Sequence, residues 1–349
     1  MPKRVYRYRF YPSPEQESLL RRTIGCARFV YNGGLAERTR AWFQEKRRIP
    51  YNELSAQLTQ TKQDPALSWL NEVSSVPLQQ ALRHLQRAFV NFWEGRAGYP
   101  RFRKKRGGGA AEFTRSAFRY TEDPERSGTG ALLLAKTEAP LDLRWSRPLP
   151  KGHVPSTVTV TLDPAGRWHI SLVVEEVIQA LPPAEAAVGV DLGLTHLAIL
   201  SDGRKISNPK HLARDSTRLV RAQRSLSRKL EAQKQTNDPE KKRWSNLEKA
   251  RRRLARVHAR IADRRRDRLH KLTTHLVREN QVIAVESLAV KNMVQNRHLS
   301  KAISDAGWSE LVRQLAYKCE WYGRTLLRLD TWFPSSKTCS SCGQMLDSL

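Results

Sequence analysis

Two short apolar runs, each containing an acid near its end, constrain the fold of this chain more than any other feature. Residues 186–193 read Ala-Ala-Val-Gly-Val-Asp-Leu-Gly, and residues 281–286 read Gln-Val-Ile-Ala-Val-Glu. Runs of this length and composition are typical of strands buried within a sheet. We expect both runs to lie in one sheet and to present Asp191 and Glu286 at the same edge.

The first run is expected to be covered on both faces of the sheet, so the negative charge of its carboxylate, Asp191, must be compensated. Desolvating an unpaired acid is costly, and no basic residue lies close to Asp191 in the sequence. A hard cation such as Mg²⁺ takes oxygen ligands, and a pair of Mg²⁺ ions supports phosphodiester cleavage. Asp191 and Glu286 are therefore candidate catalytic and Mg²⁺-binding residues. The alternative is an acid at a strand end that faces water.

The charge balance indicates a polyanionic partner. The 349 residues include 62 Lys and Arg against 34 Asp and Glu, and the net charge of +28 is typical of nucleic-acid-binding proteins. No apolar stretch approaches the roughly 20 residues that span a bilayer, and four cysteines are too few for a disulfide framework. We expect a cytoplasmic, nucleoid-associated protein without membrane contact, and a basic membrane-surface protein is the distant alternative.

The first half of the chain predicts a helical module inserted into a β-rich domain. Residues 3–11 alternate like a strand with one basic face, and Ser13-Pro14-Glu15 is typical of a helix start. Further helices are expected over 34–48, 51–63 and 77–94, and strands over 131–136, 141–145, 156–162 and 167–177. We predict a small β-barrel from residues 1–11 and 95–180, a helical module over 12–94, and a linker at 181–185.

An extended basic segment follows the helical module. Residues 98–106 read Gly-Tyr-Pro-Arg-Phe-Arg-Lys-Lys-Arg and place bases beside two aromatic residues. This pattern suits a nucleic-acid backbone with a base stacked nearby, and a solvated linker is the alternative. The candidate contacts are Arg101, Arg103, Lys104 and Lys105.

The second half predicts a meander of three strands, formed by the run at 186–193 together with residues 195–200 and 204–206, and then the most basic tract of the chain. Residues 210–278 contain 23 Lys and Arg but only 7 Asp and Glu, and leucines recur at sevens on either side of residues 237–239. Two helices packed as an antiparallel hairpin over 209–279 are expected. Their arginines have few acidic partners, which favours a polyanion over simple solvation. The candidate contacts are Arg214, Arg218, Arg221, Arg228, Arg252, Arg256 and Arg260.

The C-terminal part predicts a helix, a strand and a cysteine knuckle. The helix is expected to be capped within residues 300–305 and to run to Tyr322, and the strand to cover 324–330. Cys339 and Cys342 form a Cys-x-x-Cys pair of the kind that opens a zinc ribbon. Cys26 and Cys319 lie on helical stripes and are expected to be core thiols.

In this order the segments resemble the TnpB/OrfB family of insertion-sequence proteins, relatives of the type V CRISPR effectors, over nearly the whole chain. The matching segments are Ala27-Arg-Phe-Val-Tyr-Asn32, residues 98–106, Gly189-Val-Asp-Leu-Gly193, Val285-Glu286-Ser-Leu, Ile303-Ser-Asp-Ala-Gly-Trp308, and Pro334-Ser-Ser through Cys342-Gly343.

The resemblance implies an α/β fold with all-β and all-α modules. It implies a wedge-type β-barrel (1–11 and 95–180), an inserted helical recognition module (12–94), a RuvC-like RNase H domain (185–331) and the start of a zinc ribbon (332–349). It also implies a guide RNA from the transposon end and RNA-directed cutting of target DNA beside a short adjacent motif. Asp191 and Glu286 match the family's first two carboxylates of a two-Mg²⁺ site. Tyr51 and Gln79 would approach the adjacent-motif duplex.

The chain departs from the family pattern after the first cysteine pair. A second Cys-x-x-Cys and the third catalytic Asp do not follow, so Cys339 and Cys342 supply half of the four ligands of a Zn²⁺ site. We therefore expect a C-terminally shortened protein with impaired cleavage. The alternatives are a nuclease-dead RNA-guided repressor, a DNA-strand-transferring transposase, and a remnant without function. The Asp-Leu-Gly segment also resembles a phosphate loop of actin-like ATPases, although we find no second loop.

Overall fold

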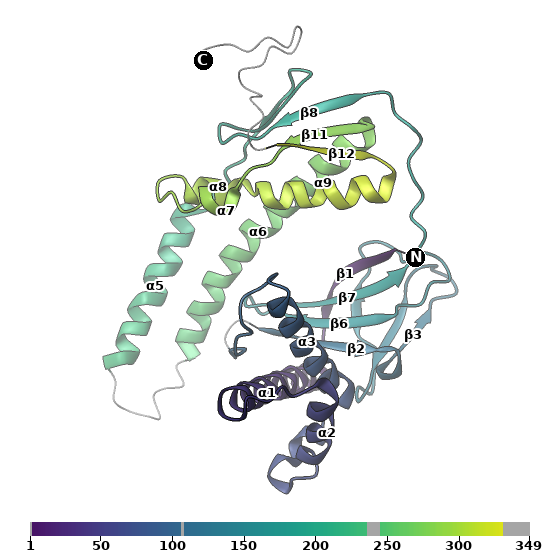
Figure 1. Ribbon diagram of the computed structural model, residues 1–349, viewed down its shortest axis with the longest axis vertical. Helices are drawn as coiled ribbons and strands as arrows, with labels where there is room; N and C mark the ends of the chain where they lie inside the picture. The colour runs from purple at the N-terminus through teal and green to yellow at the C-terminus, as the bar shows by residue number, and fades with distance from the viewer. Residues whose placement is uncertain (1, 106–107, 236–244, 331–349) are drawn as a thin grey trace. The chain divides into compact units, whose positions relative to one another are not determined.

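The computed structural model describes residues 2–105, 108–235 and 245–330, and the chain forms two compact units, residues 1–177 and 178–349 (Figure 1). Each unit contains its own sheet and its own hydrophobic core. Within the described ranges, no helix is both long enough and apolar enough to cross a membrane.

The first unit is built on an antiparallel sheet of five strands in the order β2-β6-β7-β1-β5. Strand β1 pairs with β7 from Lys3 opposite Glu175 to Arg9 opposite His169, which joins the two ends of the unit. A separate hairpin, β3 with β4, packs its apolar side chains on the same core. The strands are β1 (Lys3–Tyr11), β2 (Gly109–Thr114), β3 (Phe118–Glu122), β4 (Gly130–Leu134), β5 (Asp142–Arg144), β6 (Thr157–Leu162) and β7 (Trp168–Glu175).

The predicted strands of this unit correspond to β1, β4, β5, β6 and β7, and β2 and β3 are additions. The five-stranded sheet is an open series of pairs, so the strands do not close into a continuous barrel within the described residues. Strand β2 reads Gly-Ala-Ala-Glu-Phe-Thr, in which only Phe113 and Thr114 are of the aromatic or β-branched types that mark a strand. It contributes Ala111 and Phe113 to the core.

Three helices lie between β1 and β2: α1 (Pro14–Glu45), α2 (Tyr51–Thr61) and α3 (Ser75–Trp93), with a 3₁₀ helix over Pro65–Asn71. Ser13 begins α1 with a capping box, in which its hydroxyl accepts from Gln16 N at 3.2 Å and Gln16 Oε1 accepts from Ser13 N at 3.1 Å. The predicted separate helix over 34–48 is wrong, because α1 continues through Gly33 and Gly34.

The continuity of α1 has a packing cause. A Cβ atom at Gly34 would lie 3.1 Å from methyl groups of both Leu82 and Leu85 on α3. Gly34 therefore permits close contact between α1 and α3, and the glycine pair does not end the helix.

The second unit contains a mixed sheet in the order β10-β9-β8-β11-β12, formed by β8 (Ala187–Asp191), β9 (His196–Leu200), β10 (Lys205–Ser207), β11 (Val282–Glu286) and β12 (Thr325–Leu329). Strands β8, β11 and β12 are parallel, and β9 and β10 return antiparallel. Both apolar runs thus lie in one sheet, and the predicted meander is β8-β9-β10.

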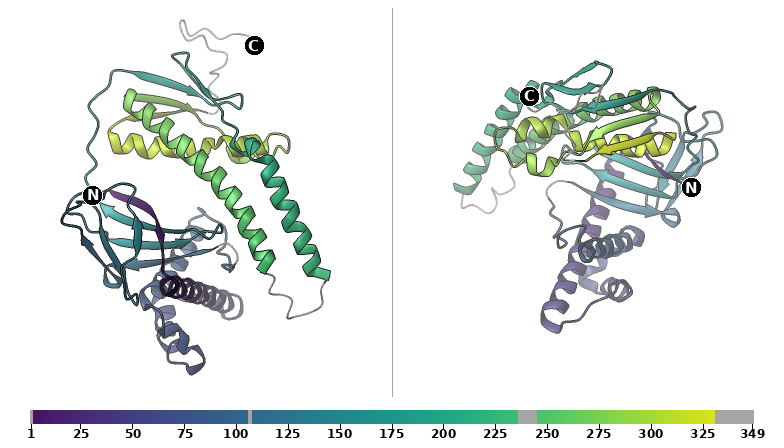
Figure 2. Two further views of the ribbon diagram at one scale, coloured as in Figure 1. Left: turned by 180° about the vertical axis from the view of Figure 1, so that it is seen from behind. Right: turned by 45° about the horizontal axis from the view of Figure 1, so that its top comes forward.

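Helices α6 (Ser245–Glu279) and α9 (Trp308–Tyr322) pack on one face of this sheet and share a core with it (Figure 2). Helix α5 (Ser216–Gln235) lies beside α6 in both views and contacts it along the hairpin. Short helices complete the unit: α4 (His211–Arg214), α7 (Val290–Met293) and α8 (Ser300–Ala306).

Three expectations for this region need correction. The predicted helix from residues 300–305 to Tyr322 is divided at Gly307, whose φ of 74° ends α8 before α9 begins. Asp305 does not cap its own helix, because its Oδ2 accepts from Leu212 N of α4 at 2.8 Å. The predicted linker at 181–185 is held to the second unit, since Arg324 donates to Pro182 O at 2.8 Å.

Candidate metal centre and nucleic-acid interface

Asp191 and Glu286 stand at the ends of neighbouring parallel strands. Strand β8 pairs with β11 from Ala187 opposite Val282 to Val190 opposite Val285. Asp191 and Glu286 are the next residue on each strand, so they occupy equivalent positions at the carboxyl edge. Because paired strands are about 4.8 Å apart, this register places the two acids next to each other.

The two acids project from the face opposite the helices. Val188 and Val190 on β8, like Ile283 and Val285 on β11, are buried in the core beneath the helices. Successive side chains of a strand alternate between faces, so the acid that follows each valine points away from that core. Asp191 is exposed and Glu286 is half-buried.

This exposure overturns one step of the sequence argument. Strand β8 is covered on one face and not on both, with alternating exposure along its length. No desolvation cost therefore requires a cation at Asp191, and the adjacency of the two carboxylates alone indicates a metal centre. Two carboxylates on one open edge suit a hard cation such as Mg²⁺. Within the described ranges, no cluster of three or more His, Cys, Asp or Glu side chains forms a ligand set.

The turn after β9 holds β8 in place beside the acid. The Gly189 N–H donates to Ser201 Oγ at 3.0 Å, and the Ser201 N–H donates to Gly189 O at 3.0 Å. Asp191 itself is paired with Ile199 of β9. The backbone at the acid is thus fixed from two sides, by β9 and by β11.

The hairpin of α5 and α6 carries a basic groove of about 670 Å³. The predicted residues Arg252, Arg256 and Arg260 line it, together with three bases that the sequence argument missed, and none of its lining residues is acidic. The missed bases are Lys229, Lys249 and Arg253. Within the part of the chain that the structure describes, no ion pair joins the three predicted arginines to an acid.

The predicted arginines of α5 are divided among different surroundings. Arg218 Nη1 lies 3.4 Å from Asp215 Oδ1, and this buried carboxylate also pairs with Arg264 at 2.8 Å. Arg228 lines a separate shallow hollow on α5. Arg214 and Arg221 are exposed and outside the basic groove. Among the predicted arginines of α5, Arg218 thus has an acidic partner, which is consistent with the expectation of few such partners.

The extended basic segment is fastened to α1. Asn32 Oδ1 accepts from Arg103 N at 2.8 Å, and Asn32 Nδ2 donates to Arg103 O at 3.0 Å. The Arg103 guanidinium lies 3.8 Å from the centroid of the Tyr31 ring. Arg101 and Lys105 are exposed, as is Phe102. The segment thus presents its cations from a fixed backbone.

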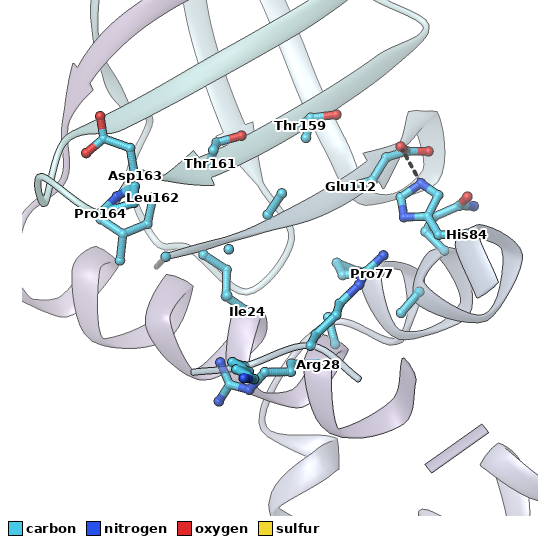
Figure 3. Close-up of a pocket in the computed structure, with 18 residues that line it drawn as sticks. Ile24, Arg28, Pro77, His84, Glu112, Thr159, Thr161, Leu162, Asp163 and Pro164 are labelled. Carbon is cyan, nitrogen blue, oxygen red and sulfur yellow. Dashed lines mark hydrogen bonds and ion pairs between the residues drawn. The ribbon is translucent and has the colours of Figure 1, made fainter. Parts of the chain in front are cut away.

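Arg103 and Lys104 border a cleft of about 410 Å³ between the helices and the sheet of the first unit (Figure 3). Arg28 of α1 and Thr159 of β6 also line it. On its far side His84 Nε2 of α3 forms a 3.0 Å hydrogen bond with Glu112 Oε2 of β2, and this hydrogen bond lowers the pKa of Glu112. Three cations and a threonine hydroxyl suit a phosphate backbone.

Tyr51 and Gln79 are not brought into one cavity. Tyr51 begins α2, and the guanidinium of Arg83 lies 4.9 Å from its ring centroid. Tyr51 lines a hollow of about 520 Å³ with Arg83 and Arg87. Gln79 is exposed on α3 outside that hollow.

The four cysteines separate into two pairs. Cys26 and Cys319 are buried core thiols, as expected, and burial raises the pKa of Cys319 to about 11. Cys339 and Cys342 lie outside the described residues.

Three family models match parts of the chain. The OrfB_IS605 model, described as "Probable transposase", matches residues 169–297. A helix-turn-helix domain model matches residues 1–47, and a Cas12f1-like TNB domain model matches residues 308–348. In the structure, residues 1–47 contain one strand, β1, and one helix, α1.

Two relatives match nearly the whole chain. A "Putative RNA-guided DNA endonuclease" of Streptomyces pristinaespiralis is 54% identical over 98% of this chain and 81% of its own length. The "Putative RNA-guided DNA endonuclease InsQ" of Escherichia coli (strain K12) is 33% identical over 97% of this chain and 83% of its own length.

Among the solved structures with a similar fold is one from the "Cryo-EM structure of the Cas12f1-sgRNA-target DNA complex". It aligns with a TM-score of 0.54 over 96% of this chain and 77% of that chain, at 13% sequence identity. This likeness shows a shared mixed α/β architecture.

Proposed function

The chain belongs to the TnpB/OrfB family of transposon-encoded proteins, and on this premise we propose that it is an RNA-guided, metal-dependent DNA endonuclease. The observation that carries the proposal is the register of β8 and β11, which sets Asp191 and Glu286 side by side at one sheet edge. The partners are a guide RNA and a target DNA, as in the names and titles of its relatives. Its work on DNA would place it with the nucleoid in the cytoplasm.

The finer architecture is part of this proposal. Residues 185–331 would form a RuvC-like RNase H domain, supported by the sheet order β10-β9-β8-β11-β12. Residues 1–11 and 95–180 would form the wedge domain, and residues 12–94 a recognition module, supported by the helices that lie between β1 and β2. Residues 332–349 would begin a zinc ribbon, with Cys339 and Cys342 as two of its Zn²⁺ ligands.

Asp191 and Glu286 are the residues that would hold Mg²⁺. When bound, a pair of Mg²⁺ ions supplies an activated water and stabilises the leaving oxygen of a phosphodiester. The protein contributes carboxylate oxygens from two strands that are hydrogen-bonded to each other, so their separation is set by the sheet. The open face of β8 leaves room for a phosphate to approach Asp191.

The cations of the chain would hold the nucleic acids. Arg252, Arg256 and Arg260 face a groove without acids, so their charges are available to phosphates. Arg103 and Lys104 would serve the cleft of the first unit, whose lining acids Glu112 and Asp163 contact His84 and Arg167. These contacts would provide the binding affinity, while base pairing between the guide RNA and the target DNA would provide the sequence specificity.

Cleavage of a plasmid with a guide-matched target, in Mg²⁺ and with the guide RNA bound, tests the proposal. The substitutions Asp191→Asn and Glu286→Gln should each lower the cleavage rate by about 10²-fold or more, while guide and target binding remain. Asp202→Asn is the matched control, because Asp202 is an acid in the turn of the same sheet, hydrogen-bonded to Arg204. Undiminished cleavage by both site variants would refute the assignment.

A second candidate is RNA-guided DNA binding without cutting. It is favoured by the site itself, since the described residues bring two acids and no larger ligand cluster to this edge. The same plasmid assay separates the two functions. Guide-dependent binding by the wild type without strand scission would support the binder and exclude the nuclease.

A further inference from the structure

The first unit contains an aromatic pocket that the nuclease proposal does not use. It is a cavity of about 290 Å³ at the C-terminal ends of α1 and α3, and we call it the aromatic pocket. Its principal lining residues are Arg38, Trp42, Arg48, Phe92, Trp93 and Tyr99. Four of the six are aromatic, and each of these four is more than one-third exposed.

Arg38 is a buried cation with unused donors in this pocket. Its side chain is 6% exposed, and its guanidinium lies 5.1 Å from the centroid of Phe89. Nη2 donates to Gln86 Oε1 at 2.5 Å, but Nε and Nη1 are buried without a hydrogen-bond partner in the described part of the chain. Leaving buried donors unsatisfied is costly, so a ligand with acceptor atoms would gain from binding here.

Arg48 shows what kind of group the tryptophans hold. Its guanidinium lies 5.6 Å from the ring centroid of Trp42 and 5.4 Å from that of Trp93. A guanidinium is planar and stacks on indole rings as a base does. The two rings therefore already retain one flat group beside the cavity.

The rest of the pocket wall is fixed in orientation. The Tyr99 ring meets Phe89 and Phe92 edge-on, with centroids 5.5 Å and 5.3 Å away. Its hydroxyl forms a hydrogen bond with Thr39 Oγ1 at 2.9 Å. A preformed aromatic wall lowers the ordering cost of binding.

Size and charge select the ligand. The volume is at the lower limit of the roughly 300–1000 Å³ of ligand pockets, so it admits a single ring system and excludes a duplex. Arg47 is neutralised by Glu53 at 2.8 Å, whereas no ion pair engages Arg38 or Arg48 within the described residues. An acceptor-rich, flat group on an anionic chain fits this combination.

We propose that the aromatic pocket binds one unstacked nucleobase of a single-stranded nucleic acid. The base stacks on Trp93 and Trp42 in the position that Arg48 now takes. Its acceptor atoms accept hydrogen bonds from the unpartnered Nε–H and Nη1–H groups of Arg38. Arg48, once displaced, meets the neighbouring phosphate. The inference rests on the proposed nucleic-acid function but assigns a separate site, in the first unit.

The test compares one base with none. Eight-nucleotide strands with seven abasic positions and one central 2-aminopurine are titrated against the full chain at 0.3 M salt, alongside strands that are abasic throughout. Stacking of one base contributes about 1–3 kcal/mol, so the base should tighten binding about 5- to 150-fold and quench the 2-aminopurine fluorescence. Ribose and deoxyribose versions show whether RNA or DNA is the source of the base.

Variants test whether the added affinity for the base comes from the pocket. Trp93→Ala and Trp42→Ala should lose most of the affinity that the base adds, and Arg38→Met should lose part of it. Phe43→Ala is the matched control, because Phe43 is an exposed aromatic of α1 that does not line the pocket. Circular dichroism verifies that each variant is folded.

The outcomes separate the two proposals. Equal affinity for the two strands overturns the pocket while leaving the nuclease assignment intact. A gain that survives in both tryptophan variants also overturns it, because the base then stacks elsewhere. Salt-insensitive binding of the fully abasic strand would instead count against phosphate contacts, and so against the proposed nucleic-acid function.

Discussion

Replacing Arg252, Arg256 and Arg260 together by Gln should flatten the salt dependence of nucleic-acid binding. The three arginines line one groove of the α5–α6 hairpin, no lining residue of that groove is acidic, and no described acid pairs with them. Each arginine that contacts a phosphate releases condensed counterions, and this release makes binding weaken as salt rises. Removing the contacts should therefore remove their share of the slope.

The magnitude follows from the number of contacts. Each phosphate contributes about 0.9 to the slope of log K against log salt for duplex DNA and about 0.7 for single strands. Three contacts therefore contribute about 2–3. Between 50 and 200 mM salt, the wild type should lose about 20- to 40-fold more affinity than the triple variant.

Fluorescence anisotropy with labelled guide RNA and target duplex, repeated at several salt concentrations, measures this slope. The matched control replaces Arg21, Arg40 and Arg313 by Gln, which removes the same charge from arginines already paired with Glu17, Glu37 and Glu310. Its slope should stay near the wild-type value. Equal slopes for the wild type and both variants would refute the assignment of the groove as a phosphate-binding site. An equal decrease of the slope in both variants would show that the effect comes from the net charge of the protein and not from the groove.

Three further predictions concern the second unit, each measured by urea unfolding. Arg324→Ala should lower the free energy of unfolding by at least about 3 kcal/mol, because it strands three buried or part-buried acceptors at about 1 kcal/mol or more each; a loss below about 1 kcal/mol would contradict this. Burial lowers the pKa of Lys318 to about 8, whereas in the unfolded chain the pKa of this amine is about 10.5. As pH rises from 8 to 10.5, the free energy of unfolding of the wild type should therefore increase by about 3 kcal/mol relative to that of Lys318→Met. Parallel pH profiles for the two proteins would contradict this prediction. Asp215→Asn should lower the free energy of unfolding by about 1–3 kcal/mol, because it weakens the interactions of a buried carboxylate with Arg218 and Arg264. An unchanged free energy of unfolding would show that these ion pairs do not stabilise the fold.

The adjacency of Asp191 and Glu286 could be predicted from sequence because it depends on pattern alone. Counted up to their acids, the segments 186–191 and 281–286 are equally long, so parallel pairing from their first residues brings Asp191 and Glu286 to the same edge. The burial of the first run could not be predicted in the same way. Ala187 and Gly189 occupy its uncovered face, and because both are small and uncharged, the alternation with Val188 and Val190 is hidden.

Contacts between distant segments explain the remaining differences. Gly33 and Gly34 have the appearance of a helix end, but Leu82 and Leu85, 48 and 51 residues after Gly34, pack closely against Gly34 within a continuous helix. The groove bases Lys249 and Arg253 repeat at the same helical spacing as Arg256 and Arg260, so this signal was available in the sequence. The aromatic pocket had no such signal, because its residues come from two helices and the segment after them.

The length of α6 has a mechanical consequence. Its 35 residues extend about 50 Å as one rod, from the arginines of the groove to Leu272 and Leu276 beneath the sheet. Only Asn280 and Gln281 separate its last residue from the strand that carries Glu286. A polyanion bound in the groove would therefore contact the same helix that leads directly into the strand carrying Glu286.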